Sequence, residues 1–149
     1  MLGLSIEQAK AGFFDRKAVL SDADRKQKKV GGAWGAFTRT VARRSIRARK
    51  GTSKEGQPPF SHVGLLRQWI LFAWDAARKS TVVGAARLNK PGLAPATLEH
   101  GGSTVLLRRK PRRGEPARKT VQIRPRPYMA PAAAKGNAKL PGFIAEAAT

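Results

Sequence analysis

Apolar residues recur at helical spacing through the first third of the chain. The stripe has a period near 3.6 residues and consists of Val30, Trp34, Phe37, Val41 and Ile46. Ser21 and the two aspartates that come after it are typical of a helix N-terminus, because they cap free backbone N–H groups and oppose the helix dipole. The pattern predicts one amphipathic helix over about residues 22–48. Three glycines within it favour either a kink or the close approach of another backbone.

The pattern changes after Pro58-Pro59, which end any regular element. Apolar runs at 68–74 and 80–86 are separated by a loop of hairpin length and are predicted to pair as strands. A short helix is expected over 94–100, followed by two further strand candidates at 104–109 and 119–123. The segment between these two strands would then be the arginine-rich tip of a second hairpin. These elements predict an α+β fold, with the long helix packed on a small antiparallel sheet.

The C-terminal segment is rich in proline and alanine. Pro125, Pro127 and Pro131 favour an extended backbone, and Pro141-Gly142 is expected to divide the last residues into two weak helical pieces. We therefore expect an extended C-terminal tail. The chain is predicted to be a single domain over 1–149, made of an N-terminal arm (1–20), an α+β core (21–131) that carries a projecting basic hairpin (104–123), and the tail (132–149).

The chain is strongly basic, with 30 Lys and Arg against 9 Asp and Glu in 149 residues, a formal charge of +21. Most of the excess falls in two clusters. The first contains Arg39, Arg43, Arg44, Arg47, Arg49, Lys50 and Lys54, and the second contains Arg108, Arg109, Lys110, Arg112, Arg113, Arg118, Lys119, Arg124 and Arg126. The arginine fork fits carboxylates and phosphates alike, so composition leaves both an acidic protein and a nucleic acid open as partners.

The residue types needed for common catalytic and metal sites are missing or scattered. The chain has no cysteine, and its two histidines, His62 and His100, are not spaced as metal ligands. The carboxylates form no pair suited to acid–base work, and no nucleotide-binding or nucleophile motif occurs. We therefore expect a protein that is not an enzyme, with no catalytic residue, cofactor or metal.

The longest apolar run, residues 68–74, is far shorter than the roughly 20 residues that cross a bilayer, so no membrane partner is expected. The N-terminus does not resemble a signal peptide, which predicts a cytoplasmic protein. The tryptophans lie on apolar stripes instead of among the arginines, which disfavours stacking on single-stranded nucleic acid. Glu99 is the one acidic residue between Lys90 and Arg108, and it is expected to cap a backbone or to pair with a nearby arginine.

Three segments, taken in order, resemble one family. The first is Ser53-Lys-Glu-Gly-Gln-Pro-Pro-Phe-Ser-His-Val-Gly-Leu-Leu-Arg67, which is similar to a linker and turn of the form S-x-x-G-x-P-P-x-x-H-x-G-x-L. The second is Thr81-Val-Val-Gly84 with Ala96-Thr-Leu-Glu-His-Gly-Gly102, and the third is Arg124-Pro-Arg-Pro-Tyr-Met-Ala-Pro-Ala132. Together they resemble the neck and tail-completion proteins of long-tailed bacteriophages. The long second arginine cluster and the alanine-rich tail depart from the family pattern.

The resemblance implies a structural virion protein that forms a ring, a hexamer or dodecamer, joining or completing the head–tail junction. Its implied partners are copies of itself and neighbouring neck, tail-terminator or connector proteins, with nonspecific contact with packaged DNA left open. The implied location is the virion neck or tail, and the host cytoplasm during assembly. The alternative is a basic protein that binds nucleic acid without sequence preference.

A subunit or partner interface is expected at charged residues and at the closing signature. Glu99 would then face an arginine of the adjacent subunit, because it stands isolated among basic residues. The residues expected at the interface are Glu99, Arg43, Arg44, Arg47, Arg108, Arg109, Arg112, Arg113, Arg126, Tyr128 and Met129.

Overall fold

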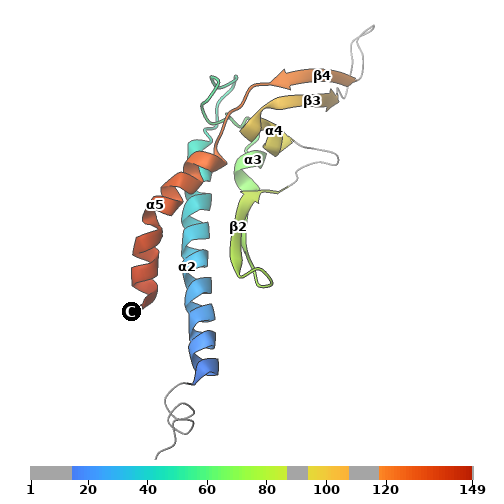
Figure 1. Cartoon of the computed structure of the whole chain (residues 1–149). Coiled ribbons are helices and arrows are strands. Elements are labelled where there is room, and N and C mark those ends of the chain that lie inside the picture. The colour runs from blue at the N-terminus through green and yellow to red at the C-terminus, as the bar shows by residue number, and fades with distance from the viewer. Residues whose placement is uncertain (1–14, 87–93, 108–117, 149) are drawn as a thin grey trace, which may run out of the picture.

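The computed structural model describes residues 15–86, 94–107 and 118–148, and these form a mixed α+β fold (Figure 1). A long N-terminal helix is followed by a hairpin, a short helix, a second hairpin and a C-terminal helix. The elements are α2 (Arg16–Ser45), α3 (Leu65–Gln68), β1 (Ile70–Asp75), β2 (Ser80–Ala85), α4 (Ala94–His100), β3 (Gly102–Leu107), β4 (Arg118–Ile123) and α5 (Met129–Ala148). The α+β prediction is confirmed.

Helix α2 starts earlier than the sequence predicts. Asp15 is its N-cap, and the carboxylate accepts a hydrogen bond from the Ala18 N–H at 3.0 Å. Part of the expected arm, residues 16–20, therefore belongs to the helix, while residues 1–14 lie outside the described residues. The helix ends at Ser45 because Ile46 is extended and buries its side chain.

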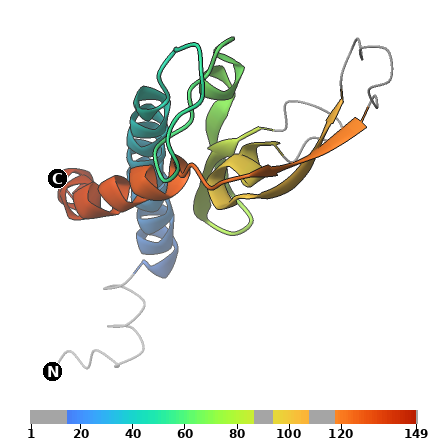
Figure 2. The ribbon, with the colours of Figure 1, turned by 90° about the horizontal axis from the view of Figure 1, so that it is seen from above.

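Helix α2 is the central element of the fold. Helix α5 packs along one side of it and the β1–β2 hairpin along the other, as two perpendicular views show (Figures 1 and 2). The long helix therefore packs two faces against two different elements.

Glycines bring the neighbours of α2 close to it. A Cβ atom at Gly35 would lie 2.7 Å from Cδ2 of Phe72, and one at Gly31 would lie 2.9 Å from the Trp74 ring. On the other side, a Cβ atom at Gly136 of α5 would lie 2.9 Å from the Trp34 indole nitrogen. The atoms that approach Gly31 and Gly35 belong to side chains of the β1–β2 hairpin, whereas the sequence predicts either a kink or another backbone at these glycines.

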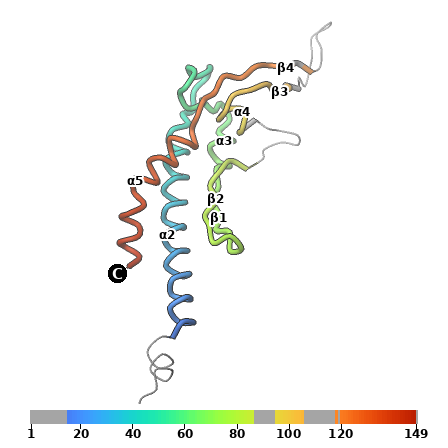
Figure 3. Tube along the Cα trace, in the orientation of Figure 1, coloured from blue at the N-terminus to red at the C-terminus, as the bar shows by residue number. Residues whose placement is uncertain are grey.

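The strands form two separate two-stranded antiparallel sheets instead of one. In the first, Phe72 pairs with Val83 and Asp75 with Ser80; in the second, Thr104 pairs with Val121. Both predicted hairpins are thus confirmed, but the small sheet under α2 is β1–β2 alone. The β3–β4 hairpin extends away from α2 (Figure 3). Its connector, residues 108–117, lies outside the described residues.

The prediction of an extended C-terminal tail is wrong, because residues 129–148 form the continuous helix α5. Pro141 lies inside this helix. A face of small and apolar side chains stabilises it against α2, and packing of this kind overrides the weak helix propensity of proline and glycine. Members of the face include Ala132, Gly136 and Phe143, whose ring centroid lies 6.0 Å from that of Phe37.

The core is small and lies at the C-terminal end of α2, where α3, β1 and the start of α5 meet. Its buried residues are Ala42, Ile46, Leu66, Ile70, Tyr128 and Ala132. Tyr128 is the largest side chain that is fully buried among the described residues. Strand β1 begins in this core at Ile70, and Leu98 of α4 packs against it.

Candidate interaction site

The side chain of Glu99 caps helix α5. Its carboxylate accepts hydrogen bonds from the backbone N–H groups of Tyr128, Met129 and Ala130, at 2.9, 3.0 and 2.8 Å. A helix leaves four N–H groups free at its start. The fourth position here is Pro131, which has no N–H, so all four positions are accounted for. This is the capping role expected for Glu99.

The segment that leads into α5 is held on both sides by further hydrogen bonds. The Arg126 N–H donates to the Leu98 carbonyl at 2.7 Å, and its Nε donates to the Ser53 carbonyl at 3.1 Å. The Gly56 N–H donates to the Pro125 carbonyl at 3.0 Å. The loop before α3, the end of α4 and the start of α5 therefore form one bonded junction.

Burial at this junction affects Tyr128. Desolvation, and secondarily the negative charge of Glu99, raises the pKa of Tyr128 to about 12. Both effects disfavour the phenolate form. Tyr128 is 2% exposed, so its side chain belongs to the core of this chain. The prediction that Tyr128 is an interface residue would need its side chain on the surface, and within this chain it is not there.

A groove lined by four arginines runs between the last turns of α2 and helix α3. Its volume is about 480 Å³. It is lined by Arg39, Thr40, Arg43, Arg44, Gly64, Arg67 and Gln68. We call it the arginine groove. It places four arginines on one concave surface, and it therefore marks a candidate site for an anionic partner.

Two of these arginines are fixed by the protein. The Arg39 guanidinium stacks over the Phe72 ring, 5.0 Å from its centroid, and Arg43 donates through Nη2 to the Gln68 carbonyl at 2.6 Å. The Nε atoms of both arginines are buried without a hydrogen-bond partner in the described residues. Arg44 and Arg67 are exposed. The groove thus combines two positioned guanidinium groups with two solvated ones.

No ion pair in the described residues neutralises the arginine groove. Several acidic side chains elsewhere are already paired, and hydrogen bonds from Lys26 and Arg25 hold the pKa of Asp22 below its usual value. The ion pairs are Asp22 with Arg25 and Lys26, Asp24 with Lys79, and Glu55 with Arg124. The groove therefore carries its charge unpaired within the described chain.

Exposed apolar side chains lie next to the groove in the sequence. Val63, Leu65 and Trp69 are 78%, 47% and 47% exposed. The face of the β1–β2 hairpin that is turned away from α2 adds Leu71 and Val82, also exposed. Exposed large apolar side chains are typical of protein-binding surfaces when they gather into a patch.

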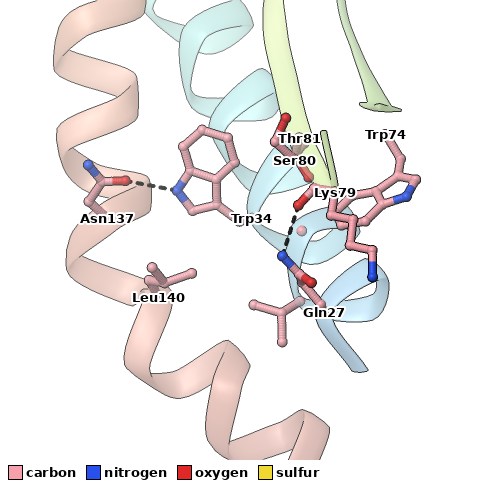
Figure 4. A pocket seen from close by; sticks show the side chains of 10 residues that line it. Gln27, Trp34, Trp74, Lys79, Ser80, Thr81, Asn137 and Leu140 are labelled. Carbon is pink, nitrogen blue, oxygen red and sulfur yellow. Dashed lines mark hydrogen bonds between the residues drawn. The ribbon is translucent and has the colours of Figure 1, made fainter. Parts of the chain in front are cut away.

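A second hollow lies between α2, α5 and the tip of the β1–β2 hairpin (Figure 4). Trp34 lies between the two helices, and its indole N–H donates to Asn137 Oδ1 at 3.0 Å. Gln27 donates to the Lys79 carbonyl at 2.8 Å. These contacts join the three elements to one another, so we assign this hollow to packing.

The residues expected at an interface fall into three groups. Arg43 and Arg44 line the arginine groove, and Arg47 is exposed just beyond it. Glu99, Arg126, Tyr128 and Met129 belong to the junction, where Met129 packs against the core. Arg108, Arg109, Arg112 and Arg113 lie outside the described residues. An arginine of a second subunit facing Glu99 stays a prediction.

The groove includes one residue that the sequence alone did not single out. Arg67 follows the last residue of the first cluster, Lys54, after a gap of residues 55–66, and only the fold places it beside Arg43 and Arg44. Arg39 belongs to that cluster but was not among the expected interface residues. The helical spacing of Arg39 and Arg43, four residues apart, is the signal that places both on one face.

Within the described ranges, no group of three or more metal-ligating side chains comes together. In the same part of the chain, no helix is long and apolar enough to cross a membrane. Comparisons with protein-family models, with curated proteins and with solved structures found no match. Function is therefore inferred from the sequence resemblance and from the geometry of the chain itself.

Proposed function

We propose that this chain is a structural protein of the neck of a long-tailed bacteriophage, where copies of it form a ring that joins or completes the head–tail junction. Its partners are other copies of itself and the neighbouring neck, tail-terminator or connector proteins. In this role the protein has no catalytic activity, and its surfaces act by binding.

The observation that supports this proposal most is the junction. Parts of all three segments that resemble the neck family meet there: the first through Ser53 and Gly56, the second through Leu98 and Glu99, and the third through residues 124–130. Residues that define one fold are expected to contact one another across long sequence separations. Exposed apolar side chains and a projecting hairpin are also typical of subunits that associate.

The test is assembly of the full chain. Purified protein, alone and after co-expression with the products of the adjacent reading frames, is examined by light scattering and by electron microscopy. We expect rings, or stable complexes with a portal, connector or tail protein. A chain that stays monomeric at high concentration and binds none of these products would contradict the proposal.

A second candidate function is nonspecific binding of nucleic acid. The observation that favours it is the unpaired charge of the arginine groove, continued by exposed Arg47 and Arg49. Such binding weakens steeply with salt, with a slope of about −0.9 per phosphate contact for duplex DNA. Titration of duplex DNA at several salt concentrations separates the two functions, because a steep slope with no ring or complex favours this one.

A further inference from the structure

We propose that the arginine groove binds an acidic peptide segment of a partner protein, one that carries several carboxylates next to an apolar side chain. The groove residues are Arg39, Arg43, Arg44 and Arg67. The identity of the partner rests on the proposed neck function. The binding chemistry does not, because it is measured on the isolated protein.

The charge of the groove calls for an anion. Four guanidinium groups line one concave surface, and none of them is paired with a carboxylate in the described residues. Repulsion between crowded like charges destabilises the folded chain. An anionic ligand relieves this repulsion, and the relief adds to its binding free energy. Carboxylates match the planar fork of arginine with two parallel hydrogen bonds.

The groove is partly organised before a ligand arrives. Stacking on Phe72 holds Arg39, and the hydrogen bond to the Gln68 carbonyl holds Arg43. Less side-chain entropy is therefore lost on binding than with four mobile arginines. Arg44 and Arg67, which are exposed, can then close on the ligand from either side.

Exposed apolar side chains on and next to the short helix that supplies Arg67 favour a protein over a nucleic acid. Leu65 and Trp69 are each 47% exposed within and directly after α3, the same helix that supplies Arg67. Tryptophan and arginine together are typical of the residues that contribute most to protein–protein binding. A phosphate backbone offers charge and sugar but little to cover such apolar side chains, and it is bound by longer rows of cations.

The test uses a fluorescein-labelled peptide of Glu and Asp residues around one Leu, and a short duplex DNA, each titrated against the full chain by anisotropy. The groove variant is Arg44→Glu with Arg67→Glu, both at exposed positions. The control is Lys17→Glu with Lys28→Glu, exposed on α2 and equal in charge change. Circular dichroism verifies that both variants are folded.

We expect the groove variant to bind the peptide about tenfold more weakly or worse, and the control to stay within about twofold of the unmodified chain. Equal losses in both variants would overturn the proposal, since they would reflect net charge alone. No binding of the peptide would overturn it as well. DNA binding that is tighter than peptide binding and is lost in the groove variant alone would replace the peptide with nucleic acid.

A further variant tests the apolar part of the ligand. Trp69→Ser, at a half-exposed position, is expected to weaken binding of the Leu-containing peptide about threefold or more. The same variant should leave binding of a peptide with Ser in place of Leu unchanged. If Trp69→Ser has no effect on either peptide, the apolar requirement is wrong. Assembly assays on the same variants report on the neck function separately.

Discussion

The two hairpins of this protein have strands of the same length and the same antiparallel pairing but opposite relations to the rest of the fold. The β1–β2 hairpin lies against α2 and places Phe72 and Thr81 over its glycines. The β3–β4 hairpin leaves the body of the protein, and its nearest packed neighbour is the short helix α4. Two adjacent strands can pair through their own backbone groups. Packing of the resulting hairpin also requires a second element whose surface leaves room for its side chains.

Small residues on α2 make room for the hairpin that packs against it. Gly31 and Gly35 leave room for the aromatic rings of β1, so this sheet half-buries one face. The β3–β4 hairpin meets no such surface, and Val105 in it is 55% exposed. What anchors the second hairpin instead is a set of polar contacts at its base, centred on Glu99.

The largest expected effect comes from filling the space under the packed hairpin. Gly35→Ala places a Cβ atom 2.7 Å from the Phe72 ring and should reduce the free energy of unfolding by about 2–3 kcal/mol. Gly32→Ala is the matched control, because nothing lies within 4 Å of its Cβ position and alanine favours the helix by about 0.5–1 kcal/mol. Urea denaturation measures both. A loss in Gly32→Ala as large as in Gly35→Ala would contradict the role of close packing.

The next effect concerns the base of the projecting hairpin. Glu99→Ala removes the acceptor for three N–H groups at the start of α5 and should cost about 2 kcal/mol. Hydrogen exchange of the amides of residues 128–130 should accelerate more than that of the α2 amides. Glu55→Ala, which breaks the exposed pair with Arg124, should cost at most about 0.5 kcal/mol. Similar losses in both variants would refute the capping role.

The buried tyrosine at the same base should make stability fall at alkaline pH. The pKa of Tyr128 is raised from 10.0 to about 12, so between these values the unfolded chain loses the proton and the folded chain keeps it. Stability that is fully present below pH 10 therefore declines as the pH rises. Tyr128→Phe should flatten this decline by about 1–2 kcal/mol. Denaturation curves of both proteins across this range test the prediction, and parallel declines would contradict it.

The smallest expected change in stability comes from making the same substitution, Val to Thr, in each hairpin. Val83→Thr lies opposite Phe72 on the face packed against α2, and burying the hydroxyl should cost about 1 kcal/mol. Val105→Thr lies on the exposed hairpin and should change stability by less than about 0.5 kcal/mol. Equal costs would mean that β3–β4 is packed as firmly as β1–β2. The midpoints of urea denaturation give the difference directly.

The sequence was sufficient for elements that depend on local patterns. The stripe from Val30 to Ile46 predicted α2, and the two apolar runs predicted the pairing of β1 with β2. The start of α2 was misplaced because Asp15 and Ser21 are both good N-caps, and local sequence cannot rank them. Which of the two caps begins the helix therefore depends on the rest of the fold and not on local sequence.

The sequence predicts two weak helical pieces where the continuous helix α5 lies, because Pro141 and Gly142 are unfavourable inside a helix. The small and apolar positions 132, 136, 140, 143 and 147 recur at helical intervals, and this stripe is the signal that could have revealed the helix. The bonds from Glu99 to residues 128–130 could not be predicted in that detail. They join positions about thirty residues apart, and no local pattern specifies which helix a distant carboxylate will cap.

The hydrogen bond between Leu98 and Arg126 closes the chain on itself, so residues 99–125 depart from and return to one point. The β3–β4 hairpin is thus closed at its base, and its length does not determine the positions of the other elements. Changes in the length of strands β3 and β4 are therefore expected to leave α2, α5 and the arginine groove in place. The protein can in this way change its reach and keep its scaffold.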